Sequence, residues 1–298
     1  MSTPQRGRPV VVGVDGSEPA RRAVRWAAQE AVRRRVPLRV VTAFEWLRGQ
    51  PIGYVGMGDS YREIMLGVSR RHLAEAAQLA EQEQPELEVQ SQLVVGFPIA
   101  VLTDEARRAQ LVVIGDRGLG GVTGLLLGSV AVALGAHAEC PVVVVRGDAE
   151  TPDPEAPVVV GVDGSPTSEA ALAFAYEAAA VRNVPLVAVH TWWDLLVDPA
   201  VAPLLDWDAI EDGERQLLAE RLAGWAEKFP DVPVRRVVTR DHAAHALVEQ
   251  SLRAQLVVVG SRGRGSIAGL VLGSVSHAVL HRAHCPVAVV RAETTSAG

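Results

Sequence analysis

Val10-Val-Val-Gly-Val-Asp-Gly-Ser17 returns unchanged as Val158-Val-Val-Gly-Val-Asp-Gly-Ser165. Three further segments return in the same order: 110–118 as 255–263, 124–130 as 269–275, and 140–146 as 285–291. The chain of 298 residues also has the length of two ordinary domains of about 150 residues each. We therefore predict two copies of one domain, residues 1–146 and 157–298. The stretch 147–156 between them, rich in Pro, Asp and Glu, is predicted to be a linker.

The composition excludes several classes of function. The formal net charge is −6, whereas binding to nucleic acid or to an anionic membrane surface needs a basic excess. The sequence shows no apolar segment typical of a secretory signal or a membrane span. Cys140 and Cys285 are too few to staple a fold, so we expect reduced thiols and a cytoplasmic location. Lys228 is the only lysine, which excludes a lysine-containing P-loop.

Short β-branched segments alternate with longer helical ones in both copies. The predicted strands are almost wholly apolar, as expected when helices cover both faces of a parallel sheet. They span residues 9–14, 38–44, 87–95, 110–115 and 141–146, and then 157–162, 186–191, 233–239, 255–260 and 286–291. This alternation predicts an open parallel α/β sheet in each domain.

The segment after the first strand has the pattern of an amphipathic helix. Residues 18–35 are predicted to be helical, with Ser17 as the N-cap and arginines on the outer face. The stripe predicted to face the core consists of Ala23, Val24, Ala27, Ala31 and Val32.

Two loops in each copy follow strands at the edge where open α/β sheets bind ligands. The first is Asp15-Gly16-Ser17. The second begins with Gly115-x-x-Gly118 and continues through nine residues to Gly128-Ser129. Glycines let backbone N–H groups approach an anion, and the helix predicted over residues 130–137 adds its free amides and its dipole. This pattern predicts a phosphate site. The alternative is that the glycines only form turns and that Ser129 only caps the helix.

These motifs together resemble the universal stress protein family, and specifically its tandem, ATP-binding type. The resemblance covers residues 9–146 and 157–291. It implies a Rossmann-like, adenine-nucleotide-binding fold, with a five-stranded parallel sheet and four helices in each domain. ATP, with or without Mg²⁺, is expected between the first and fourth strands. The family also implies that the last strands, 142–146 and 287–291, pair across an interface that joins the two domains or two chains, which predicts a homodimer.

The resemblance implies a set of nucleotide-binding residues at matching positions in the two copies. In the first copy these are Gly13, Asp15, Ala43, Gly115, Arg117, Gly118, Gly128, Ser129 and Val130. In the second copy they are Gly161, Asp163, Thr191, Gly260, Arg262, Gly263, Gly273, Ser274 and Val275. Ala43 and Thr191 match the position whose backbone contacts adenine.

The charged residues of this set leave alternatives open. A carboxylate at Asp15 or Asp163 repels a triphosphate unless Mg²⁺ intervenes or the group faces the ribose or base. We favour the ribose or base side. Arg117 and Arg262 could neutralise phosphate or simply extend into solvent. Asp116 in the first copy stands where the second copy has Ser261, so we expect the second site to bind ATP at least as tightly as the first.

Other polar clusters are weaker candidates for a site. His277, His281, His284 and Cys285 have spacings that resemble a metal site, but the first copy has no matching histidines, so we predict no metal. Asp241 is expected to be a helix N-cap beside exposed histidines rather than an acid–base residue. Plain loop packing is favoured over base stacking for three tryptophans that follow the second strands: Trp46, Trp192 and Trp193.

Three functional hypotheses remain. The first is an ATP-binding regulator in stress adaptation that acts through a protein partner, with no catalytic residues. It is favoured because no base occupies the same position in both copies. The second is a slow ATP hydrolase or an adenylate-forming enzyme on the same fold. The third is an assembly module without a ligand.

Overall fold

A computed structural model describes residues 7–45, 58–119, 127–146, 153–192, 206–263 and 272–292. The chain divides into two compact units, Met1–Val145 and Arg146–Gly298. The predicted linker residues 147–152 and the tryptophans Trp46 and Trp193 lie outside the described residues.

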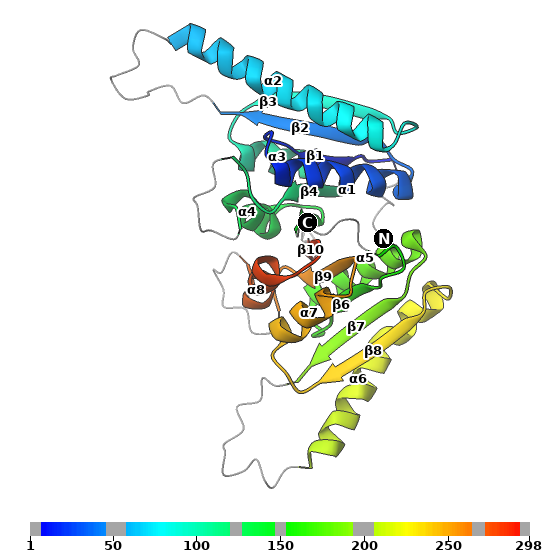
Figure 1. Cartoon of the computed structure of the whole chain (residues 1–298). Helices are drawn as coiled ribbons and strands as arrows, with labels where there is room; N and C mark the ends of the chain where they lie inside the picture. The colour runs from blue at the N-terminus through cyan, green and yellow to red at the C-terminus, as the bar shows by residue number, and fades with distance from the viewer. Residues whose placement is uncertain are drawn as a thin grey trace, which may run out of the picture. The chain divides into compact units, whose positions relative to one another are not determined.

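The first unit alternates strands and helices along the chain (Figure 1). Its elements are β1 (Val10–Gly13), α1 (Glu18–Arg34), β2 (Leu38–Phe44), α2 (Gly58–Glu83), β3 (Val89–Val95), α3 (Pro98–Ala106), β4 (Leu111–Gly115), α4 (Ser129–His137) and β5 (Val142–Val145). The strands lie in the order β3-β2-β1-β4-β5 and are all parallel. Helices α1 and α2 pack together over one face, and α3 and α4 over the other. The predicted strands and the predicted α/β fold are confirmed.

The second unit repeats this arrangement. Its elements are β6 (Val158–Gly161), α5 (Pro166–Arg182), β7 (Leu186–Thr191), α6 (Trp207–Lys228), β8 (Val234–Thr239), α7 (Ala243–Ser251), β9 (Leu256–Gly260), α8 (Ser274–Arg282) and β10 (Val287–Val290). Its parallel strands lie in the order β10-β9-β6-β7-β8. In the described part of the chain, no helix is both long and apolar enough to cross a membrane.

The strand order creates a crevice in each unit. The chain leaves β1 toward β2 on one side and returns through β4 and β5 on the other, so β1 and β4 are neighbours whose following loops diverge. In the second unit β6 and β9 have the same relation. The central strands are buried, with valines such as Val12 and Val113 fully covered. Loops that follow these four strands therefore stand on a rigid base.

Helix α1 shows where the pattern prediction was right and where it was wrong. The Ser17 hydroxyl accepts a hydrogen bond from Ala20 N at 3.3 Å, so Ser17 is the N-cap as predicted. The helix ends at Arg34, because Arg35 adopts a left-handed conformation with φ 56°. Val32 was wrongly placed in the core stripe and is 42% exposed. Since α2 covers a further side of α1, the buried face is displaced toward Trp26.

The two cysteines are buried, and this generates a prediction. Burial raises the pKa of Cys140 and of Cys285 to about 12, so thiolate is scarce at pH 8. We expect a thiol-reactive dye to label the native protein at least about 100-fold more slowly than the protein in denaturant. Two rapidly labelled thiols in the native protein would contradict the buried placement.

Candidate functional site

A carboxylate connects the two loops of the crevice in the first unit. Asp15 directly follows β1, and its Oδ1 accepts a hydrogen bond from Ser17 N at 3.0 Å. Its Oδ2 accepts a hydrogen bond from Leu119 N at 2.7 Å, across 104 residues of sequence. The carboxylate therefore joins its own loop to the loop after β4. In the second unit, Asp163 Oδ1 accepts from Ser165 N at 2.9 Å in the same way.

The same carboxylates explain why Gly118 and Gly263 lack side chains. A β-carbon at Gly118 would overlap Oδ2 of Asp15. A β-carbon at Gly263 would lie 2.6 Å from Oδ2 of Asp163, which is closer than real contacts allow. The acidic residue after the first strand and the second glycine of the loop are therefore one structural pair in each unit.

Other predicted glycines are required by packing rather than by approach of a ligand. A β-carbon at Gly115 would lie 2.7 Å from the carbonyl carbon of Pro19 at the start of α1. At Gly260 it would lie 3.0 Å from Thr167. Gly13 and Gly161 are similarly close to leucines of α3 and α7. These four glycines let helices approach the carboxyl ends of the strands.

Helices α4 and α8 present their N-termini to the loops. Gly128 is the N-cap of α4, and Gly273 is the N-cap of α8; neither helix has a side-chain cap. The alternative in which Ser129 caps the helix is therefore wrong, because Ser129 is the first helical residue. Ser129, Val130, Ser274 and Val275 all lie in first turns, where amides have no partner within the helix. These amides and glycines fit an anionic group.

The predicted adenine-contacting residues lie at the same edge of each sheet. Ala43 and Thr191 are near the ends of β2 and β7, the neighbours of β1 and β6. After Thr191, the Trp192 ring packs against Trp207 with 5.9 Å between centroids, and Arg240 lies over Trp207 at 3.8 Å. Trp192 is buried, which agrees with loop packing rather than with a stacking surface for a base.

The loop arginines have different neighbours in the two units. Arg117 Nε lies 3.7 Å from Asp116 Oδ2, and Arg22 Nη2 of α1 lies 3.7 Å from Asp116 Oδ1. In the second unit Ser261 replaces Asp116, and the Thr167 hydroxyl of α5 donates to the Arg262 carbonyl at 2.5 Å. Within the described ranges, no carboxylate forms an ion pair with the exposed Arg262 side chain.

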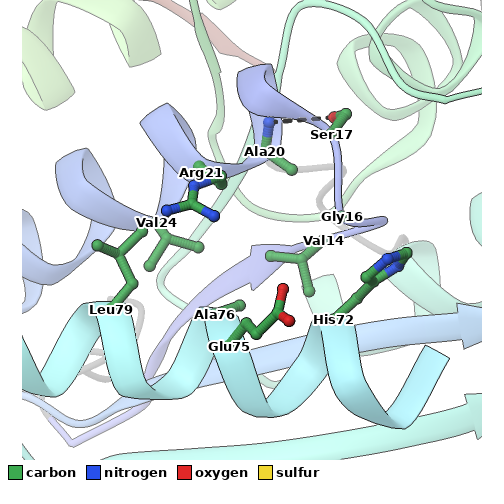
Figure 2. Close-up of a pocket in the computed structure, with 10 residues that line it drawn as sticks. All are labelled: Val14, Gly16, Ser17, Ala20, Arg21, Val24, His72, Glu75, Ala76 and Leu79. Atoms are coloured by element: carbon green, nitrogen blue, oxygen red, sulfur yellow. Dashed lines mark hydrogen bonds between the residues drawn. The ribbon is translucent and has the colours of Figure 1, made fainter. Parts of the chain in front are cut away.

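Sequence reasoning missed a side chain that covers the first loop of each unit, a histidine in the first unit and an arginine in the second. Gly16 has φ 90°, and a β-carbon there would overlap the His72 ring of α2. Figure 2 shows Arg21, Glu75 and His72 projecting into the space between α1 and α2. At Gly164, the guanidinium of Arg221 from α6 occupies the matching place and donates to Glu169 at 3.1 Å. The only sequence signal for this contact is one residue within α2 and one within α6, the second helix of each unit. The spacing of the loop motifs contains no information about either residue.

A buried histidine next to Thr191 was also missed. His190 Nδ1 lies 2.7 Å from the Val162 carbonyl, which directly precedes Asp163. Its Nε2 lies 2.8 Å from Glu214 Oε2 of α6. Because a carbonyl only accepts, Nδ1 is the donor in this bond. His190 therefore ties α6 to the end of β6, and in the first unit the Thr42 hydroxyl bonds to the Val14 carbonyl instead.

The clusters considered as acid–base or metal sites have other geometries. His242, not Asp241, is the N-cap of α7, so the predicted cap is wrong by one residue. Asp241 instead accepts a hydrogen bond from His245 Nδ1 at 2.6 Å. The His277 and His281 rings pack together with centroids 4.4 Å apart. No group of three or more His, Cys, Asp or Glu side chains in the described residues is arranged to hold a metal ion.

Comparison with known proteins decides the family. The model of the universal stress protein family matches residues 7–146 and again residues 156–291. This chain belongs to the universal stress protein family. Both domains of this universal stress protein therefore have the same origin, and the family expected from its motifs is confirmed.

Relatives of similar length extend across both domains. Universal stress proteins Rv2005c and Rv2623 of Mycobacterium tuberculosis are 44% and 43% identical to this chain. Their alignments cover 98% and 99% of this chain, and 99% and 100% of the relatives. A universal stress protein of Archaeoglobus fulgidus has a similar crystal structure, with a TM-score of 0.73, 20% identity and coverage of 97% and 98%. That last likeness shows the shared fold.

The pairing of Asp15 with Gly118 predicts a non-additive effect on stability. Gly118→Ala displaces the Asp15 carboxylate from two backbone amides, so we expect a loss of about 1–2 kcal/mol in the free energy of unfolding. Gly128→Ala is the matched control, since its β-carbon would lie 3.5 Å from Asp116 O, an ordinary contact. Urea unfolding measures both. In an Asp15→Ala background Gly118→Ala should have little further effect, and additive losses would refute the pairing.

The Asp241–His245 pair predicts two linked titrations. The hydrogen bond raises the pKa of His245 above 6.5 and lowers that of Asp241 below 3.8. Any stabilisation by the pair is thus present between these values. It is lost as pH rises through the raised His245 pKa and as pH falls through the lowered Asp241 pKa. NMR titration of Asp241→Asn should show the His245 pKa falling toward 6.5, with the His137 resonances unmoved. An unchanged His245 titration would exclude the pair.

Proposed function

We propose that this universal stress protein binds ATP in each unit and acts as a nucleotide-dependent regulator in stress adaptation. The observation that carries the proposal is the repeated crevice between β1 and β4, or β6 and β9. Each crevice is lined by a glycine loop and followed by a helix without a side-chain cap. Such amides bind anions without lysine.

Each part of the nucleotide has residues of the proposed site to receive it. The amides that follow Gly128 and Gly273 would hold the phosphates, and Ser129 and Ser274 add a hydroxyl to each site. The backbone at Ala43 and at Thr191 would contact the adenine, as the family resemblance implies.

The position of Asp15 and Asp163 supports a role for Mg²⁺. A carboxylate that is hydrogen-bonded to the phosphate loop repels a polyphosphate. A divalent cation coordinated by the carboxylate and by the phosphates would remove that repulsion. The cation would supply charge neutralisation, while the Asp15 side chain keeps the start of the loop in place through Leu119 N. We therefore propose that ATP binds more tightly with Mg²⁺ than in the presence of a chelator.

A regulator with this architecture would transmit occupancy through the loop itself. Bound phosphate would change the charge and the contacts around Gly118 and Gly128, and so alter a surface for a regulatory protein partner. The family resemblance supports a homodimer as the acting form. A slow ATP hydrolase remains the alternative, and a turnover above about 0.1 s⁻¹ would favour it over the regulator.

The proposal predicts tight and site-specific adenine nucleotide binding. Native mass spectrometry of freshly isolated protein should show bound adenylate, and calorimetry with Mg-ATP should give two sites per chain. Gly118→Ala combined with Gly263→Ala should weaken binding at least about tenfold, because each β-carbon displaces a loop-anchoring carboxylate.

Gly67→Ala combined with Gly224→Ala is the control for the two glycine changes. These glycines lie in α2 and α6, where an added β-carbon meets nothing within 4 Å. The control should bind like the parent. The proposed function fails if the unsubstituted protein carries no adenylate and binds none at millimolar Mg-ATP.

A further inference from the structure

The two sites fasten the same loop to the same helix by different chemistry. In the first unit the junction is ionic: Asp116 of the loop lies between Arg22 of α1 and its own neighbour Arg117. In the second unit it is neutral, since the Thr167 hydroxyl of α5 bonds to the Arg262 carbonyl. The counterparts of Arg22 and Asp116 are Ala170 and Ser261. The two units therefore differ at both members of this residue pair.

Asp116 is an incompletely compensated charge. Its side chain is only 7% exposed, and both of its ion pairs measure 3.7 Å, beyond hydrogen-bond distance. Its Oδ1 atom is buried without a hydrogen bond. Ion pairs at 3.7 Å without a hydrogen bond compensate a buried carboxylate less fully than hydrogen-bonded pairs do. The remaining field of Asp116 acts on the loop, because residues Gly115 and Arg117 flank Asp116 directly.

The same contact reduces the availability of the loop arginine. Arg117 is half exposed, and to reach a phosphate it must leave Asp116, its nearest carboxylate. Arg262 has no such competitor among the described residues, and the neighbouring Ser261 is neutral. Each added phosphate therefore gains less from Arg117 than from Arg262 and is repelled by Asp116 in the first unit alone.

We propose that Asp116 and Ser261 set different preferences for phosphate number at the two sites. The second site distinguishes nucleoside triphosphate from monophosphate strongly, whereas the first distinguishes them weakly. This inference rests on the proposed adenine nucleotide binding and adds the specificity of each site. One chain would then respond at one site to total adenylate and at the other to its degree of phosphorylation.

Single-site chains test the proposal. Gly263→Ala leaves the first site to be measured, and Gly118→Ala leaves the second. Calorimetry with AMP, ADP and ATP at fixed Mg²⁺ and salt gives the ratio of the AMP to the ATP dissociation constant in each chain. We expect this ratio to be about fivefold larger at the second site.

Reciprocal exchanges identify the residues responsible. Arg22→Ala with Asp116→Ser should raise the first-site ratio toward that of the second. Ala170→Arg with Ser261→Asp should lower the second-site ratio. Exchanging both members of a pair avoids an unpaired buried charge, and circular dichroism verifies folding. Asp104→Ser with Arg107→Ala is the matched control, because this exposed ion pair lies away from the loop and its removal also leaves the net charge unchanged. It should leave the first-site ratio unchanged.

The outcomes separate the two proposals. Equal ratios at the two sites, or ratios that neither exchange moves, overturn the inference while leaving nucleotide binding intact. An effect of the Asp104/Arg107 control as large as that of the Arg22/Asp116 exchange also overturns it, since loss of any ion pair would then change the ratio. Absence of binding to the unsubstituted protein overturns the proposed function itself.

Discussion

Two hydrogen bonds to the Asp15 carboxylate join the loops that follow β1 and β4 in the first unit. Asp15 accepts from the loop it belongs to and from the loop that follows β4, so the ends of two neighbouring strands are linked through one side chain. The loop after β4 can approach only because Gly118 leaves space for that carboxylate. Asp163 likewise accepts a hydrogen bond from Ser165 N and lies against Gly263. The local geometry of the proposed site thus depends on a carboxylate that is already hydrogen-bonded to the protein backbone.

Around this constant element the two units differ in their supporting contacts. The side chain over the first loop is His72 in one unit and Arg221 in the other. The end of the second strand is tied by a threonine hydroxyl in the first unit and by His190 with Glu214 in the second. A duplicated fold thereby keeps its backbone geometry while the electrostatic surroundings of each crevice diverge. Such divergence is where two copies of a site acquire separate properties.

Periodicity and repeats were sufficient to predict the fold. Largely apolar runs predicted the parallel strands, although the edge strands β3 and β8 are partly polar and exposed. The duplicated Asp-Gly-Ser and glycine motifs follow β1, β4, β6 and β9. Long-range side-chain contacts were not predictable. The direction of the Asp15 carboxylate depends on a residue 104 positions away, and the buried state of Asp116 depends on Arg22. Val32 was misplaced because a single-helix pattern contains no information about the second helix that packs beside it.

The ion pair between Arg22 and Asp116 also constrains the order in which its two residues could be acquired by mutation. From an Ala and Ser pair like Ala170 and Ser261, a buried aspartate without the α1 arginine would keep only its contact with the loop arginine, at a cost of up to about 3–5 kcal/mol. An arginine arriving first could extend its long side chain to water at little cost. Mutational paths between the two kinds of unit therefore pass through the arginine-only intermediate.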